Sequence, residues 1–61
     1  MTEWCVVGSY EDDGYSIIEV MAGGCLTQPA ASEVASAMRR NCPEIRFDVH
    51  TTEYANEMGW N

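Results

Sequence analysis

The sequence contains no lysine, and its basic side chains amount to three arginines and one histidine. Ten Asp and Glu residues oppose them, which gives a formal net charge of −7 at pH 7. Proteins that hold a phosphate backbone use Lys and Arg to displace its counterions, so the composition argues against direct binding of nucleic acid. We expect a basic protein partner instead, although a high net charge also serves solubility.

The chain also lacks a Cys-x-x-Cys pair and any long apolar run. Its three cysteines, Cys5, Cys25 and Cys42, are widely spaced, unlike the dense framework of a disulfide-rich secreted domain. No stretch approaches the roughly 20 apolar residues that span a bilayer. The first residues do not resemble a signal peptide. We therefore expect a reduced, cytoplasmic protein that has no membrane partner.

The length of 61 residues predicts one domain. A chain this short buries only about 60% of the surface that its unfolded form exposes, so its stability is marginal and often depends on a partner. We predict a single domain over residues 1–61, with a core over residues 2–52 and a tail or short helix over residues 53–61.

Two reversals organise the first half of the chain. The polar turn Glu11-Asp12-Asp13-Gly14 separates two runs rich in Val, Ile and Tyr, which predicts a hairpin. If these four residues form the loop, Tyr10 pairs with Tyr15, and the register places Trp4 opposite Met21. The second reversal, Ala22-Gly23-Gly24, leads into a short third strand over residues 25–27.

A helix is predicted over residues 29–40. Thr27 provides a capping hydroxyl and Pro29 suits the first helical turn. Arg39 and Arg40 complement the negative end of the helix dipole. Its apolar positions recur at helical spacing: Ala30, Val34, Ala37 and Met38.

The last strand is predicted over residues 44–52, where apolar or Thr side chains at Ile45, Phe47, Val49 and Thr51 alternate with polar ones. These elements predict an α+β fold, a small β-β-β-α-β domain. Its three- to four-stranded, mainly antiparallel sheet has the order 3-2-1-4, with the last strand parallel to the first. One helix packs on one face of this sheet, which we expect to be the compact face of Cys5, Val7, Ile18 and Val20.

The other face of the hairpin is broad and aromatic. It is formed by Trp4, Tyr10, Tyr15, Ile17 and Met21. Leaving these side chains in water would cost a few kcal/mol, which is comparable to the stability of such a domain. Three possibilities remain for what buries this face: the tail, through Tyr54, Met58 and Trp60; a second copy of the chain in a homodimer; or a binding partner.

The middle of the chain resembles the HicB family of antitoxins over about half of the sequence. The shared features are Asp13-Gly14-Tyr15, an extended run, Gly24-Cys25, then Leu26-Thr27-Gln28 and a helix with Glu33 and Ala35. The family's Pro-rich segment is here Met21-Ala22-Gly23. The resemblance implies a partial RNase H-like β-β-β-α-β domain that grips and blocks a small, basic, RNA-cleaving toxin. In size and charge the chain also resembles small phage anti-CRISPR proteins.

The candidate chemistry is weak. Thiolates and imidazole suit zinc, so the three cysteines with His50 are a conceivable Cys₃His site, yet small core cysteines explain them better. A Cys–His nucleophile has no distinguishing spacing. The carboxylates lie in a turn, on outward strand positions and in the tail, where a metal-dependent nuclease would have to hold an anionic substrate against the chain's own charge. We expect no enzyme and no cofactor.

The sequence thus predicts a small acidic inhibitor that binds a nucleic-acid-handling protein and occludes its basic surface, as a phage anti-CRISPR or anti-defence protein does in a bacterial host cell. The alternative is a stand-alone HicB-like antitoxin domain that neutralises a toxin RNase. Acids would steer the encounter and imitate phosphates, and the aromatic face would supply holding energy or a dimer contact. The predicted acidic contacts are Glu11, Asp12, Asp13, Glu19, Asp48, Glu53 and Glu57.

Overall fold

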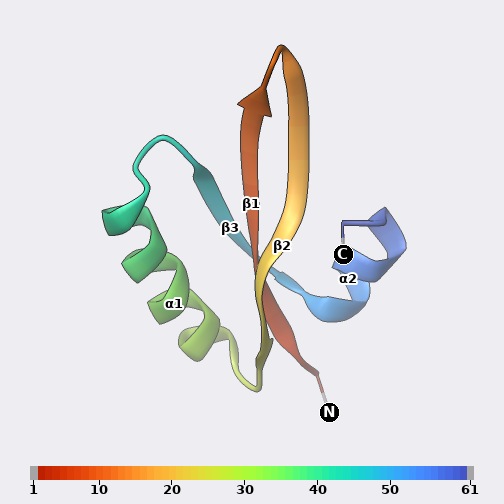
Figure 1. Ribbon diagram of the computed structural model, residues 1–61. Helices are drawn as coiled ribbons and strands as arrows, with labels where there is room; N and C mark the ends of the chain where they lie inside the picture. The colour runs from red at the N-terminus through yellow and green to blue at the C-terminus, as the bar shows by residue number, and fades with distance from the viewer. Residues whose placement is uncertain (1, 61) are drawn as a thin grey trace.

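The computed structural model describes residues 2–60, so Met1 and Asn61 of the predicted 1–61 domain lie outside the described residues. Two helices pack on opposite sides of a three-stranded antiparallel sheet with the order β2-β1-β3 (Figure 1). The predicted α+β class is confirmed. In chain order the elements are β1 (Trp4–Asp12), β2 (Tyr15–Cys25), α1 (Gln28–Asn41), β3 (Arg46–Thr51) and α2 (Thr52–Met58).

The predicted fourth strand and the order 3-2-1-4 are wrong. Cys25 ends β2 and Thr27 is already the N-cap of α1, so residues 25–27 form no strand of their own. The strand β2 continues through its two glycines without reversing. Helix α1 therefore starts from the far end of β2, and the chain then joins the sheet on the other side of β1. The strand β3 is therefore antiparallel to β1, not parallel as predicted.

The hairpin is confirmed, but its loop is shorter than predicted. Asp13 and Gly14 have φ values of 50° and 81°, as a two-residue type I′ hairpin turn requires at both positions. Asp12 therefore pairs with Tyr15, and Tyr10 pairs with Ile17 instead of Tyr15. The four-residue loop was wrong because the turn chemistry of Asp-Gly admits a tighter reversal.

The predicted second reversal is a pair of irregularities within one strand. The β1–β2 register shifts between Val7 and Val6 and again between Val6 and Trp4, so that Trp4 pairs with Cys25. The extra residues fall on β2, and Gly24 absorbs the distortion with a φ of 75°. Glycine is the residue that adopts this conformation without strain.

The two neighbouring glycines give a matched test of this geometry. We expect Gly24→Ala to lower the free energy of unfolding by about 1–2 kcal/mol, because a β-carbon at positive φ meets the following carbonyl oxygen. Gly23→Ala is the control, since a β-carbon there meets nothing within 4 Å and Gly23 is not among the glycines with positive φ. Urea denaturation measures both variants. Equal losses would contradict the assignment of the distortion to Gly24.

The first core lies between α1 and the sheet. Its buried residues are Val6, Ala31, Ala35 and Phe47. Thr27 begins α1 as predicted, because its hydroxyl accepts a hydrogen bond from the Ala30 N–H at 3.2 Å. The predicted apolar stripe was partly right: Val34 and Met38 pack against this core, but the fully buried alanines are Ala31 and Ala35 and not Ala30 and Ala37.

The side of the sheet that α1 covers differs from the prediction. The helix packs on the side of Trp4, Val6 and Met21, not on the side of Cys5 and Val7. Glycine at position 8 makes room on this side, since a β-carbon there would lie 2.7 Å from Met21 Cγ. Met21 fills the space left by the absent side chain, and the two buried alanines of α1 let the helix lie close to this side of the sheet.

The second core lies on the opposite side of the sheet. Cys5, Val7 and Ala55 are buried there, with Val20 and Trp60 packed against them. The Trp60 carbonyl accepts a hydrogen bond from the Val20 N–H at 2.9 Å, which fastens the chain after α2 to β2. The segment predicted as a tail or short helix contains α2, which covers this face, so the tail is not the cover of the aromatic face, one of the three possibilities that the sequence left open.

Candidate interaction surface

The hairpin projects beyond the rest of the molecule. The strand β3 pairs with β1 from Trp4 to Ser9, whereas the β1–β2 ladder continues to Asp12 and Tyr15. Residues 10–17 therefore form a two-stranded extension past the body that the helices cover, and Ile18, opposite Ser9, lies at its base (Figure 1). We call residues 10–18 the hairpin arm.

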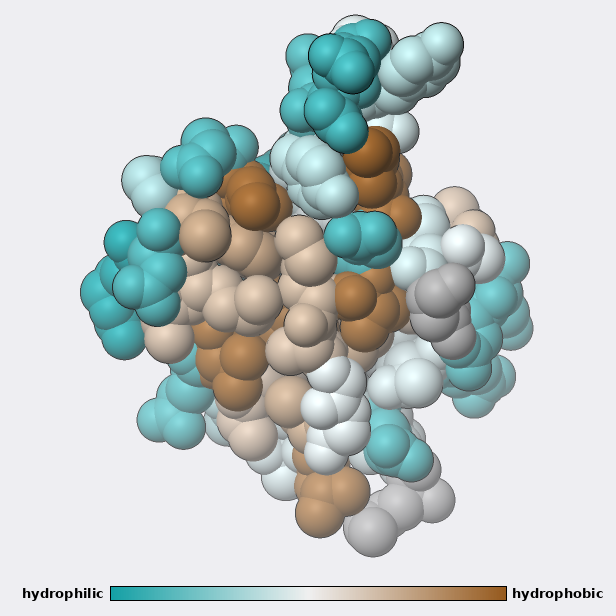
Figure 2. All heavy atoms as spheres, in the orientation of Figure 1, coloured by the Kyte–Doolittle hydropathy of each residue, from teal (hydrophilic) through white to brown (hydrophobic). Residues whose placement is uncertain are grey.

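The tip of the hairpin arm is acidic. Glu11, Asp12 and Asp13 are all exposed, and Figure 2 shows hydrophilic atoms gathered at this end of the molecule. At the base, the Tyr10 hydroxyl donates a hydrogen bond to Glu19 Oε1 at 3.2 Å. This bond raises the pKa of Tyr10, because the carboxylate stabilises the protonated phenol.

Apolar side chains lie directly behind this tip. Tyr15 is 75% exposed and Ile18 is 43% exposed, while Tyr10 and Ile17 are half-buried. An open hollow of about 310 Å³ lies against Ile17, Ile18 and the base of the arm at Arg46. Hydrophobic atoms below the hydrophilic tip are visible in Figure 2. Charge and apolar surface thus meet on one projecting element, which suits contact with a protein.

The predicted aromatic face is divided between two environments. Trp4 and Met21 are half-buried and pack against the core under α1, so they are not a free binding face. Tyr10, Tyr15 and Ile17 lie beyond that helix on the hairpin arm. Because α1 covers the near half, this half does not require the homodimer that the sequence left open.

The structure does not bring all of the predicted acids together. Asp48 lies on the α2 side of β3, where its Oδ2 is 3.2 Å from Arg46 Nε in an exposed ion pair. Glu53 and Glu57 are exposed on α2, away from the hairpin arm. The acids associated with the arm are Glu11, Asp12, Asp13 and Glu19.

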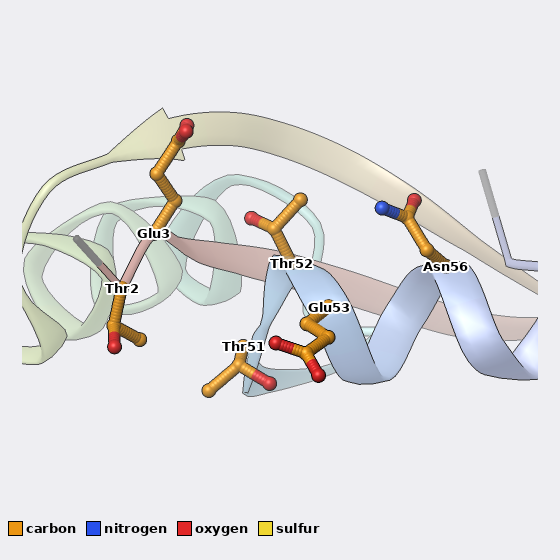
Figure 3. A pocket seen from close by; sticks show the side chains of 6 residues that line it. All are labelled: Thr2, Glu3, Thr51, Thr52, Glu53 and Asn56. Carbon is orange, nitrogen blue, oxygen red and sulfur yellow. The ribbon is translucent and has the colours of Figure 1, made fainter.

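A second hollow, of about 570 Å³, lies where the start of β1 meets the start of α2. The Thr52 N–H donates to the Glu3 carbonyl at 2.9 Å and ties the two segments together. The carboxylates of Glu3 and Glu53 point in different directions in Figure 3, so they do not form the close pair that acid–base chemistry uses. The hollow is open, and its charged groups are both acidic.

The cysteines and the histidine have separate structural roles. Cys5 lies in the core under α2, and Cys25 and Cys42 pack against the core under α1. His50 stacks on Tyr54 with ring centroids 5.2 Å apart and lies 5.2 Å from the Trp60 ring. Within residues 2–60, no group of three His, Cys, Asp or Glu side chains is placed to hold a metal ion.

The aromatic cluster of His50, Tyr54 and Trp60 was missed by sequence reasoning. The spacing of four between His50 and Tyr54 falls across the boundary between β3 and α2, so neither strand nor helix periodicity reveals it. Trp60 joins from beyond the helix end, where Gly59 adopts a φ of 73° and turns the chain back. The cluster anchors α2 to the sheet.

The burial of Cys5 predicts an order of thiol reactivity. Its side chain is 1% exposed, and burial raises the pKa of its thiol, so little thiolate forms at neutral pH. We expect iodoacetamide to modify the half-buried Cys25 and Cys42 in the native protein before Cys5. Mass spectrometry of the alkylated peptides measures this order, and unfolding in urea should abolish it. Early labelling of Cys5 would contradict the packing under α2.

No helix within residues 2–60 has both the length and the apolar character needed to cross a membrane. The Asp13-Gly14-Tyr15 part of the HicB resemblance has a local basis here, since Asp13 and Gly14 supply the two positive φ values of the hairpin turn.

Comparison with models of known protein families, with curated proteins and with solved structures found no match for this chain.

Proposed function

We propose that this protein is a non-enzymatic inhibitor that inserts its hairpin arm into the basic nucleic-acid-binding surface of a target protein. The observation that supports this proposal most is the arm itself, which carries exposed carboxylates at its tip and exposed apolar side chains behind them. Carboxylates presented on a projecting element meet a cationic groove first and replace the phosphates that the groove would otherwise hold.

The two kinds of side chain contribute differently to binding. The acids at the tip act at long range, so they raise the rate of encounter with a cationic target and make it dependent on salt. Tyr15 and Ile18 act at short range, and burying an exposed apolar side chain of this size contributes about 1.5–3 kcal/mol. Steering by the acids and holding by the apolar side chains together give a specific complex.

The charge also disfavours a second copy as the occupant of the arm. A symmetric contact between two arms would place Glu11, Asp12 and Asp13 of both copies near one another. Like charges at close range oppose such a contact. The homodimer that the sequence left open is therefore the weaker proposal for this surface, and a cationic protein is the stronger one.

The target class that we propose is a bacterial defence complex that binds nucleic acid, as in inhibition by a phage anti-CRISPR protein. The test is phage plating on a CRISPR-immune bacterial host that expresses this chain. We expect plating to rise toward that on a non-immune host, and to return to the immune level with Glu11→Lys/Asp12→Lys. Unchanged plating on hosts with each available defence system would contradict the proposal.

The second candidate target is a small toxin RNase, which also has a basic nucleic-acid-binding surface. The same expression strain separates the two candidates. Rescue of growth from a co-expressed toxin of the HicA type, without any change in phage plating, would identify the chain as an antitoxin domain. The same double variant, Glu11→Lys/Asp12→Lys, should abolish the rescue, because both targets would be bound through the same acids.

A further inference from the structure

Both edges of the sheet are hydrogen-bonded to another part of the chain at one point. At the β3 edge, Arg39 Nη2 of α1 donates to the Phe47 carbonyl at 2.7 Å. At the β2 edge, the Val20 N–H donates to the Trp60 carbonyl at 2.9 Å. Such contacts protect a sheet edge, because exposed main-chain groups otherwise form a template for another strand.

The protection of β2 does not extend along the hairpin arm. In an antiparallel strand the main-chain groups of alternate residues point to the same side. The Val20 N–H points outward to Trp60, so the main-chain groups of Ile18 and Ser16 point outward as well. The regular pairing of β1 with β2 from Val7↔Val20 to Asp12↔Tyr15 preserves this alternation.

Ser16 lies on the part of β2 that projects past β3, and Ile18, opposite Ser9, lies at the base of that projection. The sheet order β2-β1-β3 places no strand of the described chain beyond them. We propose that this edge of β2 binds an extended Lys- or Arg-rich segment of the partner as an added β-strand. The proposal rests on the proposed function and specifies the chemistry of the partner and how it docks.

Charge identifies a cationic segment as the occupant. Glu11, Asp12 and Asp13 lie across the hairpin from this edge, and Glu19 follows Ile18 on β2 itself. A second copy of the same edge would bring the same acids to the contact, and like charges in neighbouring strands destabilise pairing. A strand with Lys or Arg at alternate positions would place these cations on one face, the face that carries Glu19 of β2 and Asp12 of β1.

The two faces of the edge indicate the pattern of that segment. Tyr15, Ile17 and Glu19 lie on one face of β2, and Ser16 and Ile18 lie on the other. Cationic side chains of an added strand would lie beside Glu19 and the exposed Tyr15 ring, where a carboxylate and an aromatic face both attract them. Apolar side chains at the alternate positions would cover Ile18, which is 43% exposed.

An eight-residue peptide of alternating Lys and Val tests this edge on the full-length chain. Two derivatives carry N-methyl groups on one or the other set of alternate amides, which removes hydrogen bonds but keeps the charge. We expect the unmodified peptide to slow hydrogen exchange at the Ser16 and Ile18 amides in NMR spectra. We also expect one of the derivatives to bind at least about tenfold more weakly, because it loses two or more main-chain hydrogen bonds.

A substitution that removes one main-chain N–H of the protein supplies the matched test. Ile18→Pro removes the outward N–H at an edge where proline is tolerated, and Ile18→Val keeps it. We expect Ile18→Pro to weaken peptide binding about tenfold and Ile18→Val to leave it near the wild-type value, with circular dichroism reporting the fold. If Ile18→Pro unfolds the chain, the N-methylated peptides on the wild-type protein decide.

Any of three results would overturn the edge proposal. The first is equal binding of all three peptides, which would show that charge alone holds them. The second is binding with no protection of the Ser16 and Ile18 amides, and the third is no binding at all. Phage plating measures inhibition independently of peptide binding. Restored plating together with a negative peptide result would support the proposed function and reject strand addition.

Discussion

Trp60→Ala is expected to lower the free energy of unfolding by about 3–5 kcal/mol, as truncation of a packed aromatic side chain does. The indole packs against the core of Cys5, Val7 and Ala55 and contacts the rings of His50 and Tyr54. At about 0.05–0.15 kcal/mol per residue, a domain of this size has only roughly 3–9 kcal/mol of stability. The variant should therefore be largely or partly unfolded at 25 °C.

Chemical denaturation followed by circular dichroism measures this effect. Tyr15→Ala is the control, because it also truncates an aromatic side chain. Tyr15 is 75% exposed and belongs to neither core. We expect Tyr15→Ala to change the free energy of unfolding by less than about 0.5 kcal/mol. A Trp60→Ala protein as stable as the Tyr15→Ala protein would show that α2 does not close the second face of the sheet.

Reversing the charge of the arm should cause the largest change in binding. The variant Glu11→Lys/Asp12→Lys/Glu19→Lys reverses three acids of the arm and its base and keeps Asp13, whose positive φ the hairpin turn requires. Electrostatic steering raises association rates by roughly 10- to 1,000-fold. We therefore expect the association rate of the variant with a cationic target at low salt to be lower by a factor of about this size. The dependence of that rate on ionic strength should flatten or reverse.

A variant of equal net charge separates local steering from overall charge. Glu33→Lys/Glu53→Lys/Glu57→Lys makes three identical charge reversals at exposed positions on α1 and α2. We expect it to reduce the association rate much less than the arm variant. Surface plasmon resonance at several salt concentrations compares the two. Equal losses would mean that binding depends on net charge and not on the hairpin arm.

The sequence predicted the elements that depend on local rules. The Asp-Gly turn between two β-rich runs predicted the hairpin, and Thr27 with Pro29 predicted the start of α1. The alternation from Ile45 to Thr51 predicted β3 and the burial of Phe47. Each of these signals comes from residues close together in the chain, where backbone conformation and side-chain periodicity decide the outcome.

The wrong predictions concern choices between residues far apart in the chain. Gly23 and Gly24 are compatible with either a reversal or a distorted strand, and pairing with β1 selected the strand. Both faces of β1 are apolar, so periodicity alone could not assign α1 to one of them. Met21 fills the space left by Gly8 only once the chain has folded, so no local sequence pattern predicts this contact.

The candidate site was predicted in part. The exposed acids of the turn and the apolar residues beside them emerged from the sequence, but the division of the aromatic face did not. That division depends on where β3 begins, at Arg46 opposite Ser9, since α1 covers the sheet only as far as the three strands continue together. The exposed main-chain edge at Ser16 and Ile18 likewise depends on the sheet order and the contact at Trp60.

The central claim is that the hairpin arm occupies the place of nucleic acid on its target. The most direct measurement is competition on a purified defence complex for which plating shows inhibition, with labelled protein displaced by the complex's own nucleic-acid substrate. The account predicts mutually exclusive binding, with the arm variant no longer competing. A stable ternary complex that contains protein, target and nucleic acid together would contradict it.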